Sequence, residues 1–196
     1  MGTIVVSTNL TIDGVFADPT GEEQTAAGGW FNRVGEADMT AWSEHEEAEV
    51  QGAAALLMGA ATYRWLAERW AEREGSWADR LREIPKYVVS ATLDDPGWDT
   101  TKVLTGPVAD AVRALKEEVD GEIVVYASGH LVEALWEHDL VDQVRLVVFP
   151  FLAGDGRRLP GPGPASLMPL VGGGRLSENL VRHEYAVSRG QDRPAG

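Results

Sequence analysis

The sequence predicts an α/β domain in which a largely parallel sheet is covered by helices on both faces. Two observations predict this class: apolar runs of strand length recur along the chain, and several segments between them have the 3.6-residue period of amphipathic helices. Size and composition agree, because 196 residues with 44% hydrophobic and 24% charged side chains suit one globular core. We expect a single domain over residues 1–189 and a frayed tail over residues 190–196.

The strands come from five short runs, mostly rich in β-branched or aromatic residues, which is the composition of strands buried on both faces. They are Thr3–Val6, Ala55–Met58, Tyr87–Val89, Ile123–Tyr126 and Val144–Phe149. Strands that alternate with helices are joined by crossover connections, so most of them should run parallel.

The helices come from stripes of apolar residues three and four positions apart. The most regular stripe is Val108, Ala111, Val112, Leu115 and Val119, and Pro107 stands at its start. A second stripe is Tyr63, Leu66 and Trp70, and a shorter third one is Leu131, Leu135 and Trp136. The third helix should begin just after Ser128-Gly129.

The end of the chain follows a different pattern. Residues 151–174 are crowded with Gly and Pro and predict a long irregular segment, in which Gly172–Gly174 is interpreted as a flexible turn. Arg175–Glu178 and Val181–Ser188 then alternate partly with period two, which predicts antiparallel strands. Near the other end, Leu10–Gly29 predicts a mobile surface loop.

Composition excludes several classes of function. A formal charge of −14 would repel nucleic acid, so we expect no nucleic-acid partner. The chain has no cysteine, and its four histidines lack the paired spacing of metal ligands, so we expect no metal. No leader pattern and no apolar run near the ~20 residues of a membrane span occurs, which predicts a cytoplasmic protein without a membrane partner.

Two predicted strand-to-helix junctions could hold a phosphate group. Small residues occupy both, in Met58–Thr62 and in Tyr126–His130, and they would let a phosphate approach the free N–H groups at a helix start. Small residues also make tight turns for purely structural reasons. Spacing alone leaves both interpretations open.

At these junctions the chain resembles the dihydrofolate reductase-like superfamily, in particular the branch related to the C-terminal reductase domain of bacterial riboflavin biosynthesis. The likeness runs from about Thr3 to Val187. The matching pieces are Ile12–Ala17; Leu56–Gly59 with Thr62-Tyr63; Lys86–Ser90 with Thr92-Leu93; Ile123–Val125 with Ser128-Gly129 and Leu131; Asp139–Asp142; and Phe149–Leu152 with Gly154 and Gly156. Each piece is short, but their shared order over one domain is specific.

The resemblance implies a three-layer α/β/α fold with a mixed, mostly parallel sheet, antiparallel C-terminal strands and NADPH at the carboxyl ends of the strands. By the same resemblance, the cofactor-binding residues would be Phe16 and Ala17 along the nicotinamide, Gly59, Thr62, Ser128, Gly129 and Leu131 at the phosphates, and Ser90 with Thr92 near the adenosine. The Leu10–Gly29 loop would close over the reacting ring.

The resemblance also implies a substrate pocket at the start of the first helix. Trp30 and Phe31 are the aromatic residues expected to contact a planar substrate there. If Trp30 lines a pocket, its replacement by alanine should weaken ligand binding with little loss of stability. Asp13 is the only acidic residue that we predict to be catalytic. Alternatively, Asp13 only stabilises the turn that it forms with Gly14.

Three positions depart from the family pattern. Relatives usually have arginines that pair with the 2′-phosphate of NADPH, and this chain has Ala60 and Ala91 there. Losing charge-assisted hydrogen bonds of ~1.5–3 kcal/mol each would weaken NADPH binding by orders of magnitude. Ala127 stands where relatives usually have glycine against the pyrophosphate.

The resemblance therefore implies an NAD(P)H-dependent reductase of a small heterocyclic or carbonyl substrate, similar to 5-amino-6-(5-phosphoribosylamino)uracil reductase. NADH in place of NADPH remains open. The alternative is a non-catalytic ligand- or drug-binding domain that kept the fold and lost the 2′-phosphate contacts. The apolar late strand Val144–Phe149 and the antiparallel end of the chain further predict a homodimer.

Overall fold

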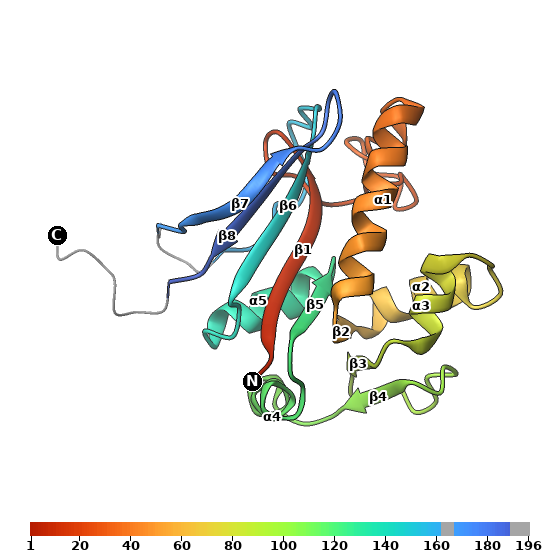
Figure 1. Cartoon of the computed structure of the whole chain (residues 1–196), viewed down its shortest axis with the longest axis vertical. Helices are drawn as coiled ribbons and strands as arrows, with labels where there is room; N and C mark the ends of the chain where they lie inside the picture. Colours follow the sequence, from red (N-terminus) through yellow and green to blue (C-terminus); the bar gives the residue numbers. More distant parts are fainter. Residues whose placement is uncertain (162–166, 189–196) are drawn as a thin grey trace, which may run out of the picture. The chain divides into compact units, whose positions relative to one another are not determined.

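The computed structural model describes residues 1–161 and 167–188, so the predicted tail over residues 190–196 lies outside the described residues. The strands are β1 (Thr3–Thr11), β2 (Ala55–Gly59), β3 (Lys86–Val89), β4 (Thr101–Leu104), β5 (Glu122–Tyr126), β6 (Gln143–Phe149), β7 (Leu170–Arg175) and β8 (Val181–Ala186) (Figure 1). The helices are α1 (Glu36–Gly52), α2 (Ala60–Trp70), α3 (Ser76–Glu83), α4 (Val108–Glu118) and α5 (Gly129–Glu137), with a 3₁₀ turn at Phe31–Arg33.

The eight strands form one mixed sheet in the order β4-β3-β2-β5-β1-β6-β8-β7. Strand β2 runs parallel to β3 and β5, and β3 runs parallel to β4. Strand β8 is antiparallel to β6 and β7. The predicted three-layer α/β class, with a mostly parallel sheet and antiparallel C-terminal strands, is confirmed.

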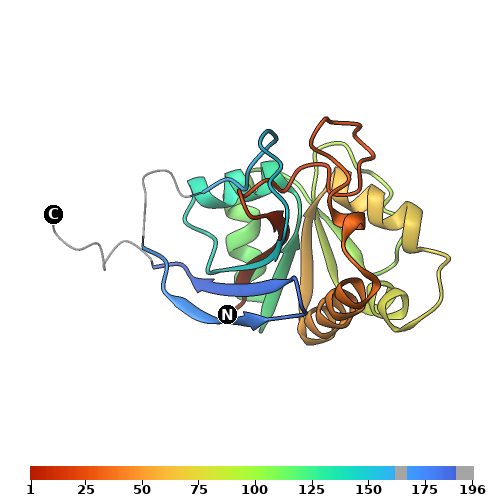
Figure 2. The ribbon, with the colours of Figure 1, turned by 90° about the horizontal axis from the view of Figure 1, so that it is seen from above.

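The chain divides into two compact units, one of residues 1–6 and 47–142 and one of residues 7–46 and 143–196. In the first unit, α2 and α3 lie on one side of the strands, and α4 and α5 lie on the other (Figure 2). Alternation along β2 explains this layering, because its successive side chains point to opposite faces and both faces are buried. Leu56 and Met58 pack with Leu66 of α2 and Leu81 of α3 in one core cluster.

All five predicted strands are present, and β1 continues five residues beyond the predicted end at Val6, to Thr11. Helix α4 begins as predicted, with Pro107 as its N-cap residue and Val112 and Leu115 buried. The first helix, expected to start at Trp30 and Phe31, begins at Glu36 instead, and Phe31–Arg33 forms a 3₁₀ turn before it. Two further elements, α3 and β4, were not predicted. Helix α3 has only eight residues, and β4 only four, so neither is long enough to show a clear period.

In the second unit the glycine-rich segment is a strand, and its interpretation as a flexible turn is wrong. Gly172–Gly174 lies within β7, which pairs with β8 through Gly173 and His183. Gly173 has a φ of +141°, and a Cβ atom there would lie 2.5 Å from the carbonyl oxygen of Arg182. Glycine is needed here because the two strands approach too closely for a side chain.

A nearly buried ion pair joins the start of β1 to α4 and to the segment before β6. The amino group of Lys116 bonds to Asp142, and their side chains are 4% and 20% exposed. The same carboxylate accepts a hydrogen bond from the backbone N–H of Ile4 at 2.8 Å. One side chain therefore satisfies a buried cation and a strand N–H together.

We predict that Asp142→Ala lowers the free energy of unfolding by about 3 kcal/mol or more, because it leaves the Lys116 ammonium buried without its partner. Urea denaturation measures the loss. Asp120→Ala is the matched control: this carboxylate, 99% exposed, pairs with the N-terminal ammonium, and its removal should leave stability unchanged within error. Equal losses in the two variants would contradict the prediction.

Candidate functional site

Three neighbouring parallel strands of the first unit end at the same edge, and most of the predicted cofactor residues follow them. In the β2–β3 pairing Gly59 lies opposite Val89, so Ser90 follows the end of β3 at the level where β2 becomes α2. Ser128 follows β5, the other neighbour of β2. Ligands of open α/β sheets bind at such carboxyl edges.

The helices that start at this edge have no side-chain caps. Gly59 is the N-cap residue of α2 and Ser128 that of α5, and neither residue's side chain accepts a hydrogen bond from the first turn of its own helix. The first-turn N–H groups of a helix have no partner inside the helix, and they concentrate positive potential there. The two helix starts are therefore suited to bind an anion.

The hydroxyl of Ser128 ties the two helix starts together. Its oxygen accepts a hydrogen bond from the backbone N–H of Gly59 at 3.2 Å and donates one to Oγ1 of Thr62 at 2.8 Å. The structure thus brings together four of the predicted phosphate contacts: Gly59, Thr62, Ser128 and Gly129. The side chain of Leu131 is 7% exposed and faces the core, so only its backbone can face a ligand.

The turn before α5 has unusual backbone geometry. Ala127 and Ser128 are both in the left-handed region, with φ values of +49° and +57°. This conformation aims the Ser128 side chain at the neighbouring junction and away from its own helix. It also explains why a glycine suits position 127, because a Cβ atom is strained at positive φ.

Ser90 and Thr92 form a turn at the end of β3. The Ser90 hydroxyl oxygen accepts hydrogen bonds from the backbone N–H groups of Thr92 and Leu93, each at 3.1 Å. Ser90 is half-buried and Thr92 is exposed. The turn therefore has a fixed shape, with the Thr92 side chain left accessible.

The other predicted site residues belong to the second unit. The carboxylate of Asp13 accepts hydrogen bonds from the Thr11 hydroxyl at 2.6 Å and from the backbone N–H groups of Ala153 and Gly154 at 3.0 and 2.8 Å. These bonds, that of Thr11 first, lower the pKa of Asp13 to about 2. A carboxyl group that stays ionised at neutral pH is a poor proton donor, and its bonds favour the interpretation that Asp13 holds a turn.

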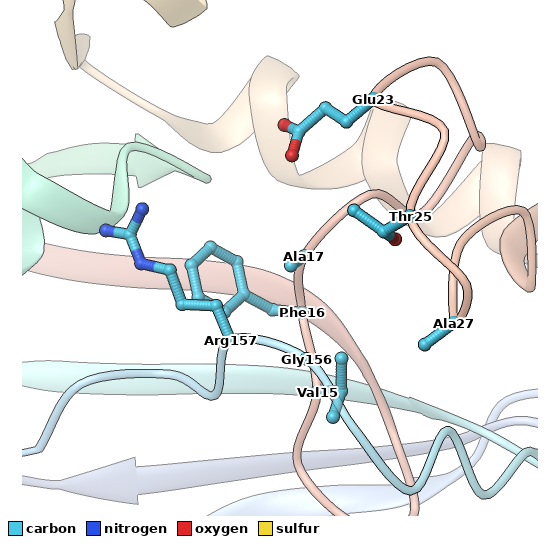
Figure 3. A pocket seen from close by; sticks show the side chains of 8 residues that line it. All are labelled: Val15, Phe16, Ala17, Glu23, Thr25, Ala27, Gly156 and Arg157. Atoms are coloured by element: carbon cyan, nitrogen blue, oxygen red, sulfur yellow. The ribbon is translucent and has the colours of Figure 1, made fainter.

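Phe16 and Ala17 line a cavity of about 220 Å³ between two loops (Figure 3). The cavity is lined by Val15, Phe16, Ala17, Glu23, Thr25, Ala27, Gly156 and Arg157. The guanidinium of Arg157 lies 5.5 Å from the centre of the Phe16 ring. The backbone carbonyl of Arg157 accepts a hydrogen bond from the backbone N–H of Phe16 at 3.1 Å. The sequence did not single out Glu23 or Arg157, because neither belongs to a periodic pattern.

The loop predicted as mobile is pinned by a second carboxylate, that of Asp18. It accepts hydrogen bonds from the N–H of Glu23 at 2.9 Å and from the N–H and the hydroxyl of Thr25, both at 2.8 Å. Burial alone would raise the pKa of Asp18, but these bonds outweigh it and lower the pKa. A Cβ at Gly28 would overlap the carboxylate, so the loop closes around Asp18.

The two aromatic candidates for substrate contact differ in exposure. Trp30 is 2% exposed and packs against Phe149, with ring centres 5.3 Å apart, in a core cluster with Val147 and Leu180. Phe31 is half-buried. The structure therefore gives Trp30 a core role and leaves Phe31 as the aromatic residue with free surface.

Two wider features bear on the site. Within residues 1–161 and 167–188, no group of three or more His, Asp or Glu side chains is placed to hold a metal ion. In the same described ranges, no helix has the length and apolar character needed to cross a bilayer.

A family model of the RibD C-terminal domain matches residues 2–181. Among solved structures, the chain is similar to a protein of Shewanella sp. PV-4 assigned to riboflavin biosynthesis, with 18% identity and a TM-score of 0.67 over 95% of this chain and 99% of that one. No curated protein matches in sequence.

Two further solved structures are similar in fold. One is the diaminohydroxyphosphoribosylaminopyrimidine deaminase/5-amino-6-(5-phosphoribosylamino)uracil reductase of Thermotoga maritima, with 16% identity and a TM-score of 0.60 over 94% of this chain and 56% of that one. The other is dihydrofolate reductase of Enterococcus faecalis complexed with NADP(H), with 12% identity and a TM-score of 0.60 over 94% and 95% of the two chains.

We predict that Ala127→Gly raises the free energy of unfolding by about 0.5–1 kcal/mol, because glycine adopts the observed φ of +49° without strain. Ala114→Gly, at an exposed position inside α4, is the control and should cost about 1 kcal/mol. Urea denaturation compares the two. Destabilisation by both substitutions would show that position 127 has no left-handed strain to relieve.

Trp30→Ala should destabilise the chain by about 3–5 kcal/mol, contrary to the small loss expected of a pocket residue, because it empties a buried site beside Phe149. Phe31→Ala removes a half-buried ring and should cost about 1–2 kcal/mol. Denaturation midpoints with unchanged slopes measure both losses. If Trp30→Ala lowers the free energy of unfolding less than Phe31→Ala does, Trp30 lines a pocket and is not a core residue.

Proposed function

Because the chain belongs to the RibD C-terminal domain family, we propose that it is a reductase that binds a nicotinamide dinucleotide at the carboxyl ends of β2, β3 and β5. Two similar structures support this proposal: one is described as a deaminase/5-amino-6-(5-phosphoribosylamino)uracil reductase and the other as a dihydrofolate reductase complexed with NADP(H). The proposed substrate of this chain is a small heterocyclic or carbonyl compound.

The observation that carries the proposal is the hydroxyl of Ser128, which holds the starts of α2 and α5 together. A pyrophosphate has two adjacent anionic groups, and two adjacent uncapped helix starts offer N–H donors and positive dipole ends to both. In this proposal Gly59, Thr62, Ser128, Gly129 and the backbone of Leu131 hold the phosphates. Ser90 and Thr92 lie toward the adenosine.

When bound, the dinucleotide would supply the hydride, so the chain itself has to orient and enclose the reactants. Phe16 and Ala17 would contact the nicotinamide, and the small cavity beside them is proposed for a planar substrate. Asp18 and Asp13 keep the loops around this cavity in one shape, because both carboxylates accept several backbone hydrogen bonds. Phe31 is the remaining aromatic candidate for substrate contact.

The choice between NADPH and NADH depends on two alanines. Ala60 is the first residue of α2, and Ala91 is exposed next to Ser90. Neither can pair with a 2′-phosphate, which arginine binds through two parallel hydrogen bonds. We propose weak binding of both dinucleotides with little preference between them.

The second candidate function is a non-catalytic domain that binds another small molecule. It is favoured by the same two alanines and by Ala127, which narrows the approach of a phosphate to the backbone. Such a domain would bind its small molecule in the cavity beside Phe16, and the paired helix starts would bind no pyrophosphate.

Titration with NADPH and NADH, followed by tryptophan fluorescence, should give dissociation constants within about tenfold of each other. Ala60→Arg with Ala91→Arg should tighten NADPH selectively, because an arginine fork recognises the phosphate that NADH lacks. Ser128→Ala should weaken both dinucleotides, since it removes the link between the helix starts.

Ala114→Arg is the control for added charge, because it places an arginine on the exposed face of α4. It should change neither affinity. If the double arginine variant binds neither dinucleotide while the unaltered chain binds an unrelated small molecule, the reductase proposal fails and the binding-domain function replaces it.

A further inference from the structure

A fully buried lysine stands at the start of β3, in the unit that carries the paired helix starts. Lys86 is 0% exposed, and its amino group donates hydrogen bonds to the carbonyls of Leu81 at 2.5 Å and Ile84 at 2.9 Å, at the end of α3. It donates a third to Oγ1 of Thr100 at 2.6 Å. Lys86 therefore joins α3 to the loop between β3 and β4.

The number of donors matches only the charged form of this lysine. An ammonium group has three N–H donors, and three acceptors surround it. The Thr100 hydroxyl gives its own proton to the carbonyl of Arg82 at 2.9 Å, so it must accept from Lys86. A neutral amine has two N–H donors and would leave one acceptor without its bond.

Aromatic contacts connect this amino group to α2. The Nζ atom lies 4.8 Å from the centre of the Trp98 ring, which meets the Tyr63 ring edge to face at 5.9 Å. The Tyr63 hydroxyl donates a hydrogen bond to the carbonyl of Pro96 in the same loop. Tyr63 directly follows Thr62, so the loop, the lysine and the helix start are mechanically linked.

Within the described part of the chain, none of the three hydrogen bonds of the Lys86 ammonium goes to a carboxylate. Its three acceptors are uncharged, and from α3 the positive Arg80 acts on it. Tyr87 and Lys102 both contact Glu118 of α4, on the opposite side of the strands, and Asp99 of the loop is exposed. From β2 the pairing neighbour is the apolar Leu56.

Burial, with a smaller effect of Arg80, lowers the pKa of Lys86 to about 8. The ammonium form dominates at pH 7 and is lost as the pH rises through this value. Its cation–π contact with Trp98 is lost with the charge.

We propose that protonated Lys86 is a positioning residue that locks the loop over residues 90–100 against α3, and that loss of its proton releases this loop and weakens dinucleotide binding. The loop carries Ser90 and Thr92, and its Trp98 packs on Tyr63 beside Thr62. The binding part of this inference rests on the proposed function, whereas the lock itself does not.

The test compares dissociation constants for NADH at pH 7 and pH 9.5, since NADH has no group that changes charge strongly between them. For the unaltered chain we expect about threefold to tenfold weaker binding at pH 9.5, the effect of one hydrogen bond. Lys86→Met should show the same affinity at both pH values. Lys102→Met, which removes an exposed lysine from the next strand, should keep the full pH dependence.

A second readout does not need the dinucleotide. The fluorescence of Trp98, taken as the difference between the unaltered chain and Trp98→Phe, should change with a midpoint near pH 8. The change should vanish in Lys86→Met. Thr100→Val keeps the lysine and should make the fluorescence change smaller. Two acceptors then remain, and a neutral amine with two N–H donors can satisfy both. This variant replaces Lys86→Met in the test if Lys86→Met does not fold.

The outcomes separate the two proposals. Absence of dinucleotide binding at both pH values, with a Trp98 transition that depends on Lys86, overturns the reductase proposal and leaves the lock supported. Binding that weakens equally with pH in the unaltered chain and in Lys86→Met, or a Trp98 signal that is constant from pH 7 to 9.5, overturns the lock.

Discussion

The candidate site depends on one hydroxyl group, that of Ser128. In most helices the N-cap serine bonds to the N–H groups of its own first turn. Here the left-handed backbone of Ser128 aims its hydroxyl at Gly59 and Thr62 of the neighbouring junction. One hydrogen-bonded group therefore fixes the spacing between two helix starts and also leaves both starts uncapped. A side chain used as a cap would have filled the same donors that an anion needs.

In the second unit, two carboxylates fix the shape of the loops by accepting hydrogen bonds from their backbone N–H groups. Asp13 joins the loop after β1 to residues 153 and 154, and Asp18 closes the loop on itself through Glu23 and Thr25. Backbone N–H groups that belong to no helix or strand still need acceptors. An ionised carboxylate offers two oxygens, and its charge strengthens each bond. The lowered pKa values of both residues follow from the same bonds that give the loops their shape.

Helices and strands with a periodic apolar pattern could be predicted from the sequence, whereas features that depend on contacts with distant residues could not. Strands β2, β3 and β5 and helices α2, α4 and α5 were predictable, because each repeats an apolar pattern over its own length. The residues at their junctions followed from the strand ends and from the family resemblance. The burial of Trp30 and the role of Lys86 were not predictable, since both are set by partners from other elements, such as Phe149 and Thr100. The glycines of β7 were misread for the same reason: only the approach of β8 explains them.

The net charge of −14 opposes the binding of an anionic dinucleotide, but this opposition is weak because salt screens distant charges. Exposed charges more than a Debye length of about 8 Å away are largely screened at physiological salt. Backbone N–H groups at a helix start act at hydrogen-bond distance, where screening is weak, and two such starts meet at Ser128. Local dipoles can therefore hold a pyrophosphate on an acidic protein. They would not distinguish between dinucleotides, because NADPH differs from NADH by its 2′-phosphate, and the alanines proposed to lie near it, Ala60 and Ala91, carry no charge.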